Sequence, residues 1–191
     1  MKNLMYSLAV VTLLVLAGVG SGAAQQGQAP PPPSKFKLMS GVFSDGGQIP
    51  TNISCADPNA ASPALSWSNP PSGATSFAIV MHDTDAAPQK GTMDVTHWIL
   101  WNIPANSTSV AANVKLDSSP DGIAQGKNIR GVNGYQPPCP PPGATPHHYV
   151  FELYALDTKV DLPAGSTRAD LLKAMDGHVI GKATTGGTFG R

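Results

Sequence analysis

The chain has 191 residues, enough for one domain with a hydrophobic core. Its 12 Lys and Arg residues balance 12 Asp and Glu residues, and only 13% of the residues are charged, so the sequence does not indicate the basic face that nucleic acid requires. The 20 Gly and 19 Pro residues indicate many turns and loops, which favours a β-rich fold over a helical bundle.

Residues 1–24 have the features of a secretory signal peptide. Lys2 is followed by an apolar run from Leu8 to Val19 and by small residues at 22–24. The run is too short for a spanning helix, which takes ~20 residues, although an uncleaved N-terminal anchor is the alternative. No Cys lies near the expected cleavage site, which argues against a lipid-anchored lipoprotein. The sequence therefore predicts export, with no stable membrane anchor after cleavage.

A Pro- and Gln-rich linker is expected at residues 25–34, followed by a single domain at 35–191. Export places this domain in an oxidising compartment, where Cys55 and Cys139 can form a disulfide. The bridge requires their Cα atoms to lie within ~7 Å, which the sequence alone does not establish. Two buried thiols are the alternative.

Short strands are expected early in the domain. Phe36 to Phe43 alternates apolar and polar side chains, Gln48 to Ser54 follows a Gly-rich turn, and Ala64 to Ser68 precedes a Pro-rich turn. The first prediction rests on side-chain alternation, and the other two rest on the turn residues beside the segments.

Two apolar, β-prone segments, Ser76 to His82 and Thr96 to Pro104, predict a hairpin. Pro88 in the loop between them has no N–H and ends any hydrogen-bonded ladder. In such a hairpin Asp83 leaves the first strand where His97 enters the second. A carboxylate and an imidazole are thus expected at the same end of one sheet.

The second half of the domain has a long irregular segment and then regular elements. Residues 105–146 lack clear periodicity, and Pro137 to Pro142 predicts a rigid wall rather than a central strand. His147 to Asp157 predicts a strong strand. A short helix is expected after an N-cap at Thr167, and His178 to Ala183 is interpreted as a second helical turn.

Polar residues at the predicted strand ends suggest a small site. His147 reaches the rim that holds Asp83 and His97 if its strand runs parallel to Thr96–Pro104. Imidazole N–H and tyrosine O–H groups donate to an oxyanion, and a carboxylate orients an imidazole through its other nitrogen. Each of these residues also has a purely structural interpretation, as a core histidine, a turn former or a core tyrosine.

The sequence predicts no metal site and no cofactor, because no His, Cys or Asp cluster has the spacing of a zinc or calcium site. There is no G-x-S-x-G motif, and Cys139 stands among prolines without a helix to lower its pKa. We therefore expect no catalytic residues.

Several motifs together resemble the phosphatidylethanolamine-binding protein (PEBP) family, in particular its bacterial YbhB/YbcL-like branch. They are GGQIP at 46–50, NAASPALSW at 59–67, DTDAAP at 83–88, THWILWNIP at 96–104, GYQPPCPPPG at 134–143, HHYVFELYALD at 147–157 and GHVIGKATTGGTFGR at 177–191. The resemblance covers nearly the whole mature domain. It implies a mostly β fold, with a large central antiparallel sheet, a smaller second sheet and short C-terminal helices.

The resemblance also implies a small pocket at one rim of the sheet that accepts phosphate or phospholipid head groups. The residues of this sequence that match the family's pocket are Asp83, Asp85, Pro88, His97, Pro138, Cys139, Pro140, His147 and Tyr149.

Three departures from the family pattern bear on affinity. Thr84 stands where the family usually has Pro, an extra Ala precedes Pro88, and His148 stands where the family has Arg. Arg carries a fixed charge, whereas His is largely neutral at pH 7, so an ion pair made by that Arg would be weakened here.

The resulting expectation is an exported, periplasmic or secreted bacterial protein that binds a small anionic ligand without turnover. Two alternatives remain open: an inhibitor or modulator of a kinase or protease through protein contacts, and a His-dependent hydrolase or lyase. The neutral surface is compatible with a monomer or a homodimer.

Overall fold

The computed structural model describes residues 36–87, 92–115 and 122–191. The expected signal peptide, the linker and Pro88 lie outside these ranges. Residues Ser34–Arg191 form one compact unit by themselves. Within the described ranges, no helix has the length and apolarity needed to cross a membrane.

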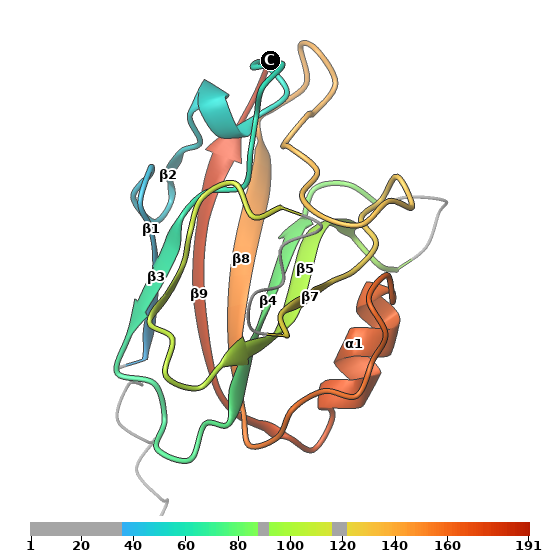
Figure 1. Ribbon diagram of the computed structural model, residues 1–191. Coiled ribbons are helices and arrows are strands. Elements are labelled where there is room, and N and C mark those ends of the chain that lie inside the picture. The colour runs from blue at the N-terminus through green and yellow to red at the C-terminus, as the bar shows by residue number, and fades with distance from the viewer. Residues whose placement is uncertain (1–35, 88–91, 116–121) are drawn as a thin grey trace, which may run out of the picture. The chain divides into compact units, whose positions relative to one another are not determined.

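A six-stranded sheet forms the centre of the domain, with strand order β2-β9-β8-β4-β5-β7 (Figure 1). All neighbours are antiparallel except β2 and β9, which run parallel. The large antiparallel sheet implied by the family resemblance is confirmed. Its strands are β2 (Gly47–Gln48), β4 (Ser76–Asp83), β5 (Val95–Pro104), β7 (Ala124–Gln125), β8 (His147–Leu156) and β9 (Val179–Phe189).

A smaller sheet covers one face of the large one. It contains β1 (Lys37–Ser40), β3 (Leu65–Ser68) and β6 (Ser109–Val110), in the order β1-β3-β6. Alternate side chains of the two sheets form the main core between them. Trp67 of β3, for example, packs on Phe77 of β4 with ring centroids 5.2 Å apart.

Helix α1 (Arg168–Met175) covers part of the opposite face, where Leu171 and Met175 join a second apolar cluster from the central strands (Figure 1). The predicted N-cap is confirmed. Thr167 accepts a hydrogen bond from the Asp170 backbone N–H, and the Asp170 side chain accepts one from the Thr167 backbone N–H, which is a capping box.

Two predictions about regular elements were wrong. Gln48 to Ser54 is not a strand, since β2 ends at Gln48 and the 3-10 helix η1 (Thr51–Ile53) follows. His178 to Ala183 is not a second helical turn, because β9 begins at Val179 and pairs with β8 along its length.

Strand β9 requires glycine at position 187 because the backbone of β2 approaches it closely. A Cβ atom on Gly187 would lie 2.6 Å from the Gly47 carbonyl oxygen of β2. A larger residue would therefore separate β2 from β9. A backbone contact of this kind leaves no side-chain pattern in the sequence, so the prediction of a helical turn at His178 to Ala183 could not take it into account.

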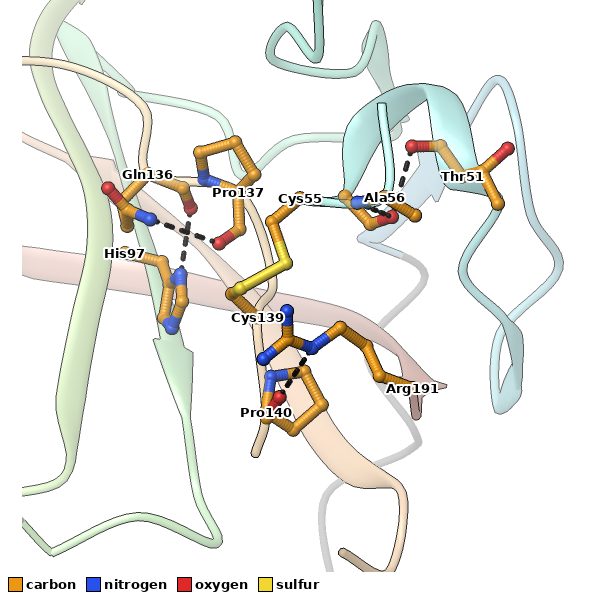
Figure 2. Close-up of a disulfide and its surroundings, with 10 residues drawn as sticks. Thr51, Cys55, Ala56, His97, Gln136, Pro137, Cys139, Pro140 and Arg191 are labelled. Atoms are coloured by element: carbon orange, nitrogen blue, oxygen red, sulfur yellow. Dashed lines mark hydrogen bonds between the residues drawn. A yellow bond between two sulfur atoms is a disulfide. The ribbon is translucent and has the colours of Figure 1, made fainter. Parts of the chain in front are cut away.

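A disulfide links Cys55, just after η1, to Cys139 in the Pro-rich segment, with Cα atoms 5.3 Å apart (Figure 2). The disulfide interpretation is confirmed over that of two free thiols. The Cys55 N–H donates to the Pro138 carbonyl at 3.0 Å, and the Arg191 Nε–H donates to the Pro140 carbonyl at 2.9 Å. The Pro-rich segment, which the sequence predicts to be a rigid wall, is thus held by Cys55 and by Arg191.

Replacing Cys55 and Cys139 together with Ser should lower the free energy of unfolding by about 4 kcal/mol, because the bridge closes a loop of 84 residues in the unfolded chain. Urea denaturation of wild type and variant checks this. A reducing agent should lower the stability of the wild type alone. Equal stability of the variant and the wild type without reducing agent would contradict the prediction.

Candidate functional site

Three central strands bring their polar ends to one rim of the large sheet. Strand β4 ends at Asp83, which lies opposite Val95 at the start of β5 and opposite Tyr149 near the start of β8. Both neighbours are antiparallel to β4 and therefore run parallel to each other. The predicted hairpin is confirmed, and the condition under which His147 reaches the rim, a strand parallel to Thr96–Pro104, is met.

Asp83 and His147 form a close pair at this rim. The His147 Nδ1 atom lies 2.7 Å from Asp83 Oδ2, and both side chains are largely buried. The other carboxylate oxygen, Oδ1, accepts the backbone N–H of Asp85 at 3.0 Å. Asp83 thus fixes the orientation of the His147 ring and leaves its Nε2 atom unused by this contact.

His97 reaches the same side of the sheet through a β-bulge. Met81 pairs with Trp98 and His82 pairs with Thr96, so His97 has no partner on β4. Strict alternation would place His97 on the face of Ile99, which belongs to the α1 side. The bulge reorients the side chain, and its ring meets Tyr149 edge-on at 5.1 Å.

The Pro-rich segment holds His97 in place. Its Nδ1 atom lies 2.7 Å from the carbonyl oxygen of Gln136 (Figure 2). The His97 carbonyl in turn accepts the Gln136 N–H at 2.8 Å. Burial lowers the pKa of His97 against the opposing effects of Gln136 and Asp83. The ring is therefore neutral at pH 7, with the proton on Nδ1 and an acceptor lone pair on Nε2.

Tyr149 lies between the two imidazoles. Its ring stacks on His147 at 6.5 Å and contacts the edge of His97. Its hydroxyl is buried and makes no hydrogen bond of normal geometry with the described residues, although Asp83 and the Cys139 N–H lie near it. Burial and the Asp83 charge raise the pKa of Tyr149. The hydroxyl therefore stays protonated and can donate a hydrogen bond.

Asp85 faces His148 instead of the imidazole pair. Its Oδ2 atom accepts the His148 backbone N–H at 2.6 Å and lies 2.9 Å from His148 Nδ1. The backbone hydrogen bond is the main cause that lowers the pKa of Asp85. His148, at the position where the family has Arg, therefore still contacts a carboxylate. The ligand-binding role of Asp85 stays a prediction, and this contact gives it a structural role.

The predicted wall residues Pro138, Cys139 and Pro140 lie in the segment that follows Gln136. Figure 2 shows Cys139 and Pro140 of this segment. Pro88 belongs to the part of the chain that is not described. No group of three or more His, Cys, Asp and Glu side chains in the described ranges is arranged to hold a metal ion.

Sequence reasoning missed Gln136, which binds His97 through both its N–H and its carbonyl. These are backbone contacts, so the identity of the side chain carries no signal for them. The position of Gln136 immediately before Pro137 is the one available hint, because a residue before proline favours extended backbone.

Because His97 is buried and neutral in the folded protein, the free energy of unfolding should fall as the pH falls. The unfolded chain binds a proton on His97 below about pH 6.5, whereas the folded chain resists it, so the unfolded state gains protons first. His97→Asn keeps a donor for the Gln136 carbonyl but does not titrate. Urea denaturation at pH 7.5 and 5.5 should show a loss that is smaller in the variant, by at most ~1.4 kcal/mol per pH unit. Equal losses in the two proteins would contradict it.

Comparison with known proteins places this geometry in a family. Residues 39–190 match the family model described as phosphatidylethanolamine-binding protein. A UPF0098 protein of Methanothermobacter thermautotrophicus is 44% identical over 157 residues, covering 82% of this chain and 99% of that protein. The crystal structure of Escherichia coli YbcL, described as a member of the mammalian PEBP family, has a TM-score of 0.74 at 31% identity and covers 82% of this chain and 99% of YbcL.

A further relative, from Mycobacterium tuberculosis, carries a lipoprotein name, LppC. It is 34% identical over 192 residues, covering 93% of this chain and 90% of that protein. The family match spans the two sheets, the disulfide segment and every described residue of the rim. The chain is therefore a member of the phosphatidylethanolamine-binding protein family.

Proposed function

We propose that this protein binds a phosphate-type anion, either free or as a phospholipid head group, at the rim formed by Asp83, His97, His147 and Tyr149. The observation that carries the proposal is that both imidazoles are anchored through Nδ1, to Asp83 and to the Gln136 carbonyl. Each ring is thus held rigidly with its Nε2 atom left for a ligand. The Tyr149 hydroxyl, which has no hydrogen bond of normal geometry with the described residues, supplies a further donor.

The hydrogen-bond donors and acceptors of the rim suit a phosphate group that carries a P–OH. Tyr149 donates through its hydroxyl, and His147 donates through Nε2–H when both of its nitrogens carry protons. Neutral His97 offers an acceptor instead, because its proton lies on Nδ1 toward Gln136. A P–OH group can donate to that acceptor while its other oxygens accept from His147 and Tyr149. We therefore expect a phosphate group that carries a P–OH, such as inorganic phosphate or the monoanion of a phosphomonoester, to bind in preference to one without a P–OH.

Binding without turnover is favoured by what surrounds the rim. The Cys139 sulfur is held in the disulfide and cannot act as a nucleophile. The Asp83–His147 pair nevertheless has the arrangement of an orienting acid and a general base. A hydrolase or lyase is for this reason the second candidate, and the experiment below includes a turnover assay.

Export is part of the proposal. A disulfide that bridges 84 residues suits an oxidising compartment, and one relative has a lipoprotein name. We propose a periplasmic or secreted location for the mature domain. Size analysis of the same preparation distinguishes a monomer from a homodimer. Action through contacts with a partner protein remains an expectation.

Isothermal titration calorimetry of residues 34–191 with inorganic phosphate and with phosphoethanolamine should show saturable binding. His97→Ala and His147→Ala should each weaken it at least about tenfold, since each removes a group at the ligand. His178→Ala is the matched control, because His178 forms an exposed pair with Asp157 at 2.9 Å outside the rim. Absence of heat with both anions would overturn the proposal.

Turnover is measured on the same proteins with a chromogenic phosphate ester. We expect no release of product above the rate in buffer. Hydrolysis that disappears in His147→Ala and persists in His178→Ala would replace the binding proposal with the hydrolase.

Tyr149→Phe separates binding from folding at this rim. The Tyr149 hydroxyl has no hydrogen bond of normal geometry, so its removal should leave the thermal unfolding temperature unchanged or slightly raised. Anion affinity should fall about five- to tenfold through loss of one donor. Calorimetry and thermal denaturation together check this. Unchanged affinity would exclude the hydroxyl from the site.

A further inference from the structure

A rigid hairpin tip, residues 127–133, stands beside the rim. Lys127 and Asn133 form an isolated bridge, and the Asn128 N–H donates to the Val132 carbonyl at 2.9 Å. The Asn128 side chain is buried, accepts the Arg130 N–H at 2.9 Å and donates to the Gly134 carbonyl at 3.0 Å. The backbone of the hairpin tip is therefore well determined by its own hydrogen bonds.

This hairpin tip exposes apolar side chains. Ile129 is 45% exposed and Val132 is 56% exposed. Met93, which is 48% exposed, lines the same surface hollow as Ile129. Large apolar side chains held out on a rigid turn gain nothing for folding, and their grouping indicates a surface that contacts something else.

The charges around these side chains that lack an ion-pair or hydrogen-bond partner among the described residues are positive. Lys127 and Arg130 are exposed on the tip, and no carboxylate of the described residues forms an ion pair with Arg130. The nearby Asp94 is already paired with His82 and Arg168. Asp170 lies near Lys127 but receives hydrogen bonds from Thr167. The tip therefore presents apolar groups flanked by cations, which complements an anionic surface.

The hairpin tip is joined directly to the strand that carries His97. The Ile129 N–H donates to the Thr96 carbonyl at 2.9 Å, one residue before His97. The segment that follows the tip reaches Gln136, which holds His97. Tip and rim consequently lie at the same end of β5, and a surface that contacts one lies near the other.

We propose that the hairpin tip, together with Met93, docks the protein on an anionic lipid surface, with Ile129 and Val132 inserted at the interface and Lys127 and Arg130 among the head groups. Three apolar side chains on a turn are far fewer than a stable protein interface uses, which buries about 800 Å² on each side. A bilayer interface accepts such a small apolar tip when cations support it. The proposal adds a delivery surface to the proposed head-group site, although docking itself does not require that site.

Sedimentation of residues 34–191 with lipid vesicles tests docking. Vesicles of phosphatidylcholine mixed with phosphatidylglycerol should bind the protein, vesicles of phosphatidylcholine alone should bind it weakly, and added salt should weaken binding to the mixed vesicles. Both Ile129→Ser/Val132→Ser and Lys127→Ser/Arg130→Ser should lower the bound fraction at least about tenfold. Val179→Ser/Ile180→Ser is the matched control, because these exposed residues begin β9, away from the tip.

Two further measurements distinguish failure of docking from failure of the anion site. The Ile129→Ser/Val132→Ser variant should keep its circular dichroism spectrum and its calorimetric affinity for phosphate. His147→Ala should lose phosphate binding and keep vesicle binding. Vesicle binding that is equal for the two lipid compositions, or unchanged in the tip variants, would overturn the docking proposal whatever the phosphate titration shows.

Discussion

Strand β4 is the constraint on which the rest of the domain depends. Every one of its residues, Ser76–Asp83, is buried, and it is hydrogen-bonded to β5 on one side and to β8 on the other. Backbone groups removed from water must be paired, so both neighbours are held in register along β4. The end of β4 therefore decides which residues of β5 and of β8 lie at the rim. It places Asp83 beside Tyr149 and close to His147.

Consecutive residues of β4 serve opposite faces of the sheet. Asp83 joins His147 on the main-core side, whereas His82 lies 2.5 Å from Asp94, which is paired with Arg168 of α1. Beyond His82, burial raises the pKa of Glu152, but hydrogen-bond donors that include Lys182 at 2.5 Å outweigh it and hold the value at about 2. One face thus joins the helix to the sheet through ion pairs, with His82 Nε2 and Arg168 Nε left without a hydrogen bond among the described residues. The other face holds two imidazoles through Nδ1 beside the buried Tyr149 hydroxyl.

The two imidazoles at the rim keep their orientation because each is anchored through Nδ1. His147 is held by a carboxylate and His97 by a carbonyl of the Pro-rich segment, which the disulfide and Arg191 hold in turn. Prolines limit the conformations open to this segment, and the cross-link removes more of them. The rings therefore need no further contacts to stay in place, which is what a preorganised binding site requires.

The sequence by itself determined the strands with clear alternation, the hairpin that joins Asp83 to His97, the capped helix and the family. These features are local, because turn residues, caps and side-chain periodicity act over a few positions. Tertiary structure decided the rest. The bulge that turns His97 toward Tyr149, the pairing of Cys55 with Cys139 and the strand at Val179–Phe189 depend on partners distant along the chain. In the Gly-rich end of the chain, local propensity for any one secondary structure is weak. Pairing with the edge of β8 imposed the extended conformation, and such pairing leaves no pattern in the local sequence.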